Sequence, residues 1–188
     1  MDFNRIVLYF NTIKYLKFIQ IFYRILYFFK KRKKLSSHNI NISTAQICFP
    51  YTLKGKKILY DDFFIFLNKK KKFKKIDWNF ILYGKLWNYN LNYFDFLLQN
   101  NISKEEGINL IFDFISKKDS LKFGNQQYPT SLRIINFIKF ISKYKIKDFR
   151  IDRIIYDDIY FLKNNLEYHL LGNHLLENGF SLLLYFNN

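Results

Sequence analysis

The second half of the chain is a succession of apolar residues at helical spacing, and this pattern constrains the fold most strongly. Between residues 76 and 188, four or five such segments follow one another with short polar links. In one of them Leu91, Phe94 and Leu98 recur at intervals of three and four residues, which places them on one side of a helix. No strand-like segments alternate with the helical ones, so the sequence predicts an all-α fold of antiparallel helical hairpins.

Helix-end signals divide these segments. Ser103 and Glu106 have the spacing of a capping box, which predicts a helix start. Pro129 suits the first turn of the next helix, because its missing N–H is not needed there. Gly172 is expected to end a long helix that begins near residue 148, and Asn173 is then in position to cap the helix that follows.

The first 34 residues differ from the rest in being aromatic, aliphatic and basic. Residues 3–30 predict one or two helices with apolar residues on most of their circumference, followed by the basic run KKRKK. Two interpretations are open: these helices pack on the remainder of the protein, or they lie on an anionic membrane surface. We therefore divide the chain into a basic aromatic helical segment (1–34), an irregular Lys-rich connecting segment with a short strand or two (35–75), and a helical domain (76–188).

The positive charge is local. The chain holds 31 Lys and Arg against 15 Asp and Glu, a formal net charge of +16. Residues 1–75 contain 18 basic and 3 acidic residues, a net of +15, whereas residues 76–188 contain 13 and 12, a net of +1. A polyanion partner is one explanation; an AT-rich genome, which favours Lys, Asn, Ile, Phe and Tyr codons, is the other. The run KKKKFKK (69–75) reads as an exposed loop, and its single aromatic residue, Phe73, argues against nucleic-acid binding by base stacking.

Residues that bind metals or cofactors are sparse. Cys48 is the one cysteine, so the chain has no internal disulfide. His38 and His169 have no partner at metal-ligand spacing, and His169 lies five residues before His174 rather than four. Neither a glycine-rich phosphate loop nor a serine nucleophile elbow is present. The sequence therefore predicts no metal and no cofactor. No secretory-signal pattern is evident either, which leaves the localisation open.

Three blocks of the sequence resemble a known family. They are IDWNFILYGKLWNYNLNYFDFL (76–97), YPTSLRIINFIKF (128–140) and NNLEYHLLGNHLLENGFSLLL (164–184). In order and spacing they resemble the N-terminal helical domain of heparinase II/III-like polysaccharide lyases, some of which are encoded with surface-polysaccharide genes. The resemblance implies an incomplete (α/α) toroid, β-elimination on uronate-containing glycans, and an anionic polysaccharide as partner.

The resemblance also assigns candidate site residues. The NH motif matches Asn173 and His174, which the resemblance makes candidate catalytic residues. Asn173 would hydrogen-bond the uronate carboxylate, and His174 would help neutralise it or act as acid or base for one epimer. Glu177 lies three residues after His174, and from this spacing we expect it to support the pair or a helix dipole. A plain interpretation is equally available: Asn173 is a helix cap, and His174 bonds the end of the preceding helix.

Further candidates for substrate binding come from the other two blocks. They are Trp87, Asn90, Tyr93, Tyr128 and Arg133. The aromatic residues among them suit either a sugar cleft or packing between helices. Arg133 suits either a substrate carboxylate or an acidic side chain of a neighbouring helix.

Family enzymes carry a further catalytic Tyr and His beyond the region that these blocks cover. We therefore expect the 188-residue chain to lack lyase activity alone, and a separately encoded C-terminal half is a possible partner. Two rival functions remain: a non-catalytic helical module that binds anionic glycan or a partner protein, and a peripheral membrane protein using residues 1–34.

Overall fold

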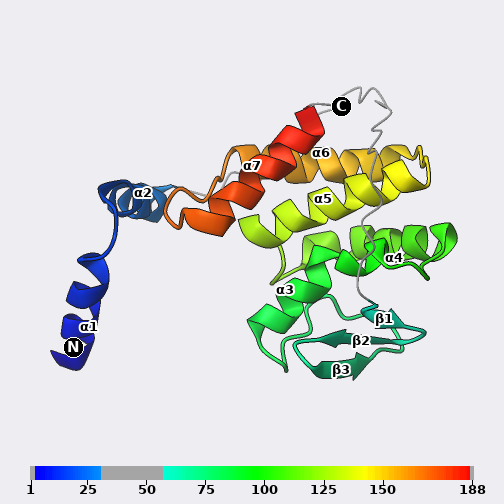
Figure 1. Ribbon diagram of the computed structural model, residues 1–188, viewed down its shortest axis with the longest axis horizontal. Helices are drawn as coiled ribbons and strands as arrows, with labels where there is room; N and C mark the ends of the chain where they lie inside the picture. The colour runs from blue at the N-terminus through cyan, green and yellow to red at the C-terminus, as the bar shows by residue number, and fades with distance from the viewer. Residues whose placement is uncertain (1–2, 31–56, 187–188) are drawn as a thin grey trace.

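The computed structural model describes residues 3–30 and 57–186, and this part of the chain is mainly helical, as the sequence predicts (Figure 1). The elements in chain order are α1 (Phe3–Ile13), α2 (Phe18–Phe29), β1 (Leu59–Tyr60), β2 (Phe63–Phe66), β3 (Lys69–Lys72), α3 (Lys85–Tyr93), η1 (Asp95–Leu98), α4 (Lys104–Lys117), η2 (Lys118–Ser120), α5 (Gln127–Lys143), α6 (Phe149–Lys163) and α7 (Gly172–Phe186). His38, Cys48 and most of the predicted connecting segment lie outside the described residues.

The small sheet is antiparallel, with strand order β1-β2-β3. Phe66 pairs with Lys69, so Leu67 and Asn68 form a two-residue turn in which both φ angles are positive. The prediction of a loop over residues 69–75 was therefore wrong for Lys69–Lys72. The lysine run pairs because β2 offers it a partner, and lysines suit the exposed outer edge of a sheet.

Aromatic packing fixes the sheet to the helices. Phe64 and Phe66 of β2 alternate with half-buried residues and point inward. Phe66 meets the indole of Trp87 edge to face, with ring centroids 5.1 Å apart. Trp87 also donates its N–H to the carbonyl of Lys69 at 3.2 Å. The sheet thus lies against α3, below the helical body in Figure 1.

The helix predicted to carry Leu91, Phe94 and Leu98 on one side is broken. α3 ends at Tyr93, Phe94 adopts the left-handed conformation with φ 64°, and η1 follows. The ring of Phe94 is completely buried; it stacks on Trp78 at 4.9 Å and meets Phe137 edge to face at 4.8 Å. A left-handed conformation is costly for a residue with a Cβ, so burial of the ring in the core must outweigh the strain.

α5 is the central helix and packs against α3, α6 and α7 (Figure 1). It begins as predicted, with Pro129 in its first turn. The predicted cap of α4 is also confirmed, because Ser103 Oγ accepts a hydrogen bond from the N–H of Glu106 at 3.1 Å. α4 carries Gly107 where a Cβ would lie 2.1 Å from Cζ of Phe140, so only glycine permits this approach to α5.

The long helix predicted to end at Gly172 is shorter. α6 ends at Lys163, and Gly172 opens α7 instead of terminating α6. The amides of Asn164 and Asn165 bond back to the carbonyls of Tyr160 and Phe161 at 2.8 and 2.7 Å. Asparagine side chains compete with the helix backbone in this way, which accounts for the early end.

Candidate functional site

Three of the residues singled out by the sequence come together. Tyr93 at the end of α3, Tyr128 in the first turn of α5 and His174 in the first turn of α7 form a continuous row of rings. The centroids of Tyr93 and Tyr128 are 5.9 Å apart, and those of Tyr128 and His174 are 4.5 Å apart. We call these three residues together with Glu167 the Tyr–His cluster. Its outer end is open, since 43% of the His174 side chain is exposed.

Glu167 orients the imidazole of His174. Its carboxylate is buried, and Oε1 lies 3.1 Å from Nδ1 of His174. The carboxylate accepts, so Nδ1 carries the proton of this bond and Nε2 remains as the ring nitrogen for an outside partner.

Glu167 is itself held in place by Asn178 of α7, which also bonds to Ser131 of α5. The side-chain oxygen of Asn178 accepts from the N–H of Glu167 at 2.9 Å, and its amide donates to Glu167 Oε2 at 3.2 Å. The same amide donates to the hydroxyl of Ser131 at 2.9 Å. Asn178 is fully buried, so the carboxylate that contacts His174 is held by a buried hydrogen-bond network.

Both tyrosines of the cluster are held in the protonated form. Burial raises the pKa of Tyr93, and the neighbouring Tyr128 and Asp95 raise it further. Burial likewise raises the pKa of Tyr128, with added repulsion from Glu177 and Asp95. Since tyrosine ordinarily titrates near pH 10, both hydroxyls are proton or hydrogen-bond donors at neutral pH, not bases.

The remaining half of the NH motif is exposed. Asn173 lies beside His174 in the first turn of α7, one residue inside the helix instead of at its cap. The sequence pointed to Glu177 as the support of this pair, whereas the carboxylate that contacts His174 is Glu167. Glu167 precedes His174 by seven residues and lies on a non-helical stretch, so no helical spacing revealed it.

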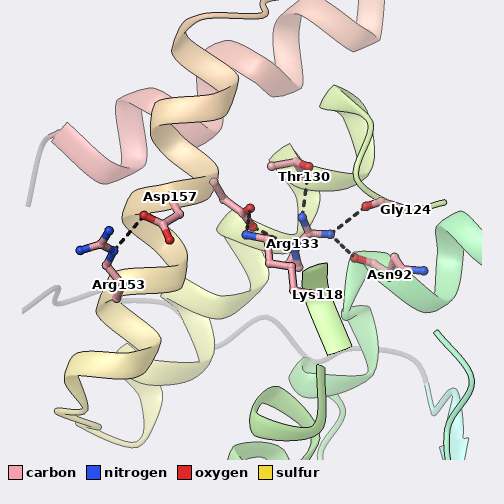
Figure 2. A network of polar contacts seen from close by, with 8 residues as sticks. Asn92, Lys118, Gly124, Thr130, Arg133, Arg153 and Asp157 are labelled. Atoms are coloured by element: carbon pink, nitrogen blue, oxygen red, sulfur yellow. Dashed lines mark hydrogen bonds and ion pairs between the residues drawn. The ribbon is translucent and has the colours of Figure 1, made fainter. Parts of the chain in front are cut away.

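Arg133 takes the second of the two roles open to it. It is fully buried in α5, and its Nε donates to Oδ2 of Asp158 in α6 at 2.9 Å (Figure 2). Its other nitrogens donate to the carbonyl of Gly124 at 2.9 Å and to the hydroxyl of Thr130 at 3.1 Å. These bonds link α5 to α6 and to the loop before α5. None of them is made to a residue of the Tyr–His cluster.

A second cation shares the same carboxylate. Lys118 of η2 also pairs with Asp158 (Figure 2). Burial by itself raises the pKa of Asp158, but the charges of Arg133 and Lys118 bring it below its ordinary value. Burial lowers the pKa of Lys118. Asp158 is thus an ionised, buried carboxylate between two cations.

Trp87 and Asn90 are the other predicted sugar contacts. Their hydrogen bonds are to Lys69 and Leu86, and not to residues of the Tyr–His cluster. Trp87 is fully buried between α3 and the sheet. The amide of Asn90 donates to the carbonyl of Leu86 within its own helix at 2.7 Å. Of the two roles considered for Trp87, a sugar cleft or packing, the structure shows packing.

A hollow of about 540 Å³ lies between the sheet and the start of α4. Its wall includes four acidic residues: Asp61, Asp62, Glu105 and Glu106. Like charges repel, so this hollow does not suit an anionic glycan.

Three further results bear on the class of protein. Over residues 3–30 and 57–186, no three His, Cys, Asp or Glu side chains are grouped so as to hold a metal ion. Within the same residues, every helix is too short or too polar to cross a bilayer. In comparisons with known proteins, no protein-family model, no curated protein and no solved structure matches the chain.

Proposed function

We propose that this chain forms a uronate-binding part of a heparinase II/III-like polysaccharide lyase, with its helices from α3 to α7 as part of an incomplete (α/α) toroid. The observation that carries the proposal is the row Tyr93–Tyr128–His174. It joins one residue from each of the three sequence blocks that resemble this family, although they lie far apart in the chain. If the resemblance came only from leucine-rich helices, we would not expect Tyr93, Tyr128 and His174 to be in contact.

The chemistry explains what such a cluster contributes. In β-elimination a base removes the C5 proton of the uronate, the C4–C5 double bond forms, and the bond from C4 to the leaving oxygen breaks as that oxygen takes up a proton. The C5 proton becomes acidic enough only when the adjacent carboxylate is hydrogen-bonded or neutralised. An imidazolium donates both ring N–H groups, so His174 can serve Glu167 with one and the substrate carboxylate with the other. Asn173 supplies an amide donor beside it.

The proposal assigns binding and charge neutralisation to these residues, with Tyr128 as a proton donor. It includes no base for C5, because the tyrosines are held protonated. We therefore expect no turnover of heparan sulfate or alginate by the 188-residue chain, measured as ultraviolet absorbance of the unsaturated product. Clear product formation would contradict this assignment.

Binding is tested with His174→Gln, and with His169→Gln as the matched control. His169 lies five residues before His174, outside α7, and its ring meets Tyr27 edge to face, whereas the ring of His174 contacts Tyr128. Losing a hydrogen bond to a charged group costs roughly 1.5–3 kcal/mol. H174Q should therefore bind a uronate oligosaccharide about tenfold more weakly or worse, whereas H169Q should bind as the wild type does.

Because a net charge of +16 attracts polyanions in general, the binding experiment needs a second, uronate-free ligand as a control. Dextran sulfate carries negative charge but no uronate, so it measures unspecific attraction to the lysines. H174Q should lose uronate affinity in calorimetry while keeping its affinity for dextran sulfate. Equal losses for both polymers, or no loss for either, would contradict a uronate site at His174.

A further inference from the structure

α2 is attached to the helical body along one stripe only. Gln20, Tyr23, Tyr27 and Lys30 recur at intervals of three or four residues and share one side of the helix. Gln20 donates to the carbonyl of Leu170 at 3.0 Å, Tyr27 to that of Leu166, and Lys30 to that of Asn164 at 2.5 Å.

Ring contacts reinforce the same stripe. Tyr23 stacks on Tyr168 at 4.7 Å, and Tyr27 meets His169 edge to face at 5.0 Å. These polar and aromatic contacts orient α2 about its own axis. The opposite side of the helix is therefore directed away from residues 164–170.

That opposite side is apolar and exposed. Five residues at helical spacing form it, and we call them the outer stripe: Phe18, Phe22, Ile25, Leu26 and Phe29, with exposed fractions of 83%, 50%, 58%, 43% and 78%. Soluble proteins rarely leave a contiguous apolar surface of this kind without a partner.

α1 also carries exposed apolar residues. Val7, Phe10 and Ile13 are also exposed, and Figure 1 shows this helix projecting away from the helical body. With 11 and 12 residues, the two helices extend roughly 16–18 Å each, well short of the roughly 30 Å hydrocarbon core of a bilayer. A bilayer would accept them only in its interface plane.

The charge pattern selects the partner. From residue 3 to residue 34 the sequence contains nine Lys and Arg and no Asp or Glu. Lys17 and Arg24 lie at the border of the outer stripe, between it and the docked side. An apolar stripe whose neighbouring charges are all positive matches an anionic lipid surface, into which the apolar residues insert while the cations meet the headgroups.

We propose that α1 and α2 form an in-plane anchor for an anionic phospholipid membrane, with the outer stripe inserted between the headgroups. The anchor does not depend on glycan binding. Because α2 is bonded to residues 164–170, it attaches the lipid-facing surface directly to the stretch that carries Glu167 of the Tyr–His cluster.

The test is flotation of the full 188-residue chain with vesicles of phosphatidylcholine alone or of phosphatidylcholine with phosphatidylserine. We expect flotation with the anionic vesicles, little with the neutral ones, and a loss of binding as salt is raised. Absence of flotation with anionic vesicles at low salt would overturn the proposal and leave the outer stripe as a surface for a protein.

Two variants separate insertion of the outer stripe from attraction of lysines elsewhere, such as those of β3. The double variant Phe22→Ser with Phe29→Ser removes two exposed outer-stripe rings, whose ring contacts are with Tyr23 and Phe28 of α2 itself. It should lower the vesicle partition coefficient at least about tenfold with an unchanged circular dichroism spectrum. Phe149→Ser, at an exposed phenylalanine that opens α6, is the control and should leave partitioning unchanged. The proposal would be overturned if the double variant floated as well as the wild type. It would also be overturned if F149S lost as much vesicle binding as the double variant.

Discussion

Replacing Asp158 with asparagine is expected to lower the free energy of unfolding by about 3–5 kcal/mol, since removing one partner leaves buried cations without their counter-charge. Asp158 is 3% exposed and pairs with Arg133, which is completely buried, and with Lys118 (Figure 2). Arg133 lies in α5 and cannot turn to solvent without opening the contacts of α5 with α6. Urea unfolding followed by circular dichroism measures the loss.

The neighbouring Asp157 provides a matched control. It pairs with Arg153 one turn away at 3.0 Å, and both side chains are partly exposed. Partly exposed pairs within a helix are worth only about 0.3–0.5 kcal/mol, so Asp157→Asn should change the stability little. A loss in D158N no larger than the loss in D157N would show that the buried network does not hold the helices together.

The same network predicts a pH dependence with a definite sign. The two cations hold the pKa of Asp158 in the folded protein below its ordinary value. Its stabilising effect is therefore complete above the unfolded pKa, near pH 4, and is lost as the pH falls through the lower folded value. The difference in stability between wild type and D158N should be constant near neutral pH and shrink only in acid.

Replacing Phe94 with alanine is expected to cost a comparable amount, about 3–5 kcal/mol, through the cavity left in the core. The ring is completely buried among Trp78, Phe114 and Phe137. Phe149→Ala serves as the control, because that ring is 76% exposed and leaves no cavity.

The left-handed backbone at Phe94 adds a more specific test. In an ordinary helix, glycine is less stable than alanine by roughly 0.5–1 kcal/mol. At φ 64° the order should reverse, because glycine alone adopts this conformation without a penalty. We expect Phe94→Gly to be more stable than Phe94→Ala in urea unfolding. The opposite order would mean that the left-handed turn is not maintained once the ring is gone.

Local signals predicted the helices well where they acted within one turn. The Ser103 cap and the Pro129 start involve neighbouring residues only, and both are confirmed. The break at Phe94 was not predictable in this way, because its cause is the packing of one ring against Trp78 and Phe137. The strand at Lys69–Lys72 likewise depends on the presence of β2.

Some residues of the candidate site could be identified from the sequence, and others only from the packing of the elements. The motif residues Tyr128 and His174 were identifiable from the sequence, and they prove to be in contact. Glu167 was missed, since its approach to His174 requires the non-helical stretch between α6 and α7. For Arg133 the sequence left two roles open, and the position of α6 selected the pairing with Asp158.

The sequence by itself determined the helical class, the starts of α4 and α5 and the concentration of positive charge before residue 76, because these follow from spacing and residue type alone. The tertiary structure decided which side chains meet: the row of Tyr93, Tyr128 and His174, the burial of Arg133, and the side of α2 that remains exposed. The physical reason is that burial and long-range pairing depend on how the elements pack against each other, and no spacing within one element contains that information.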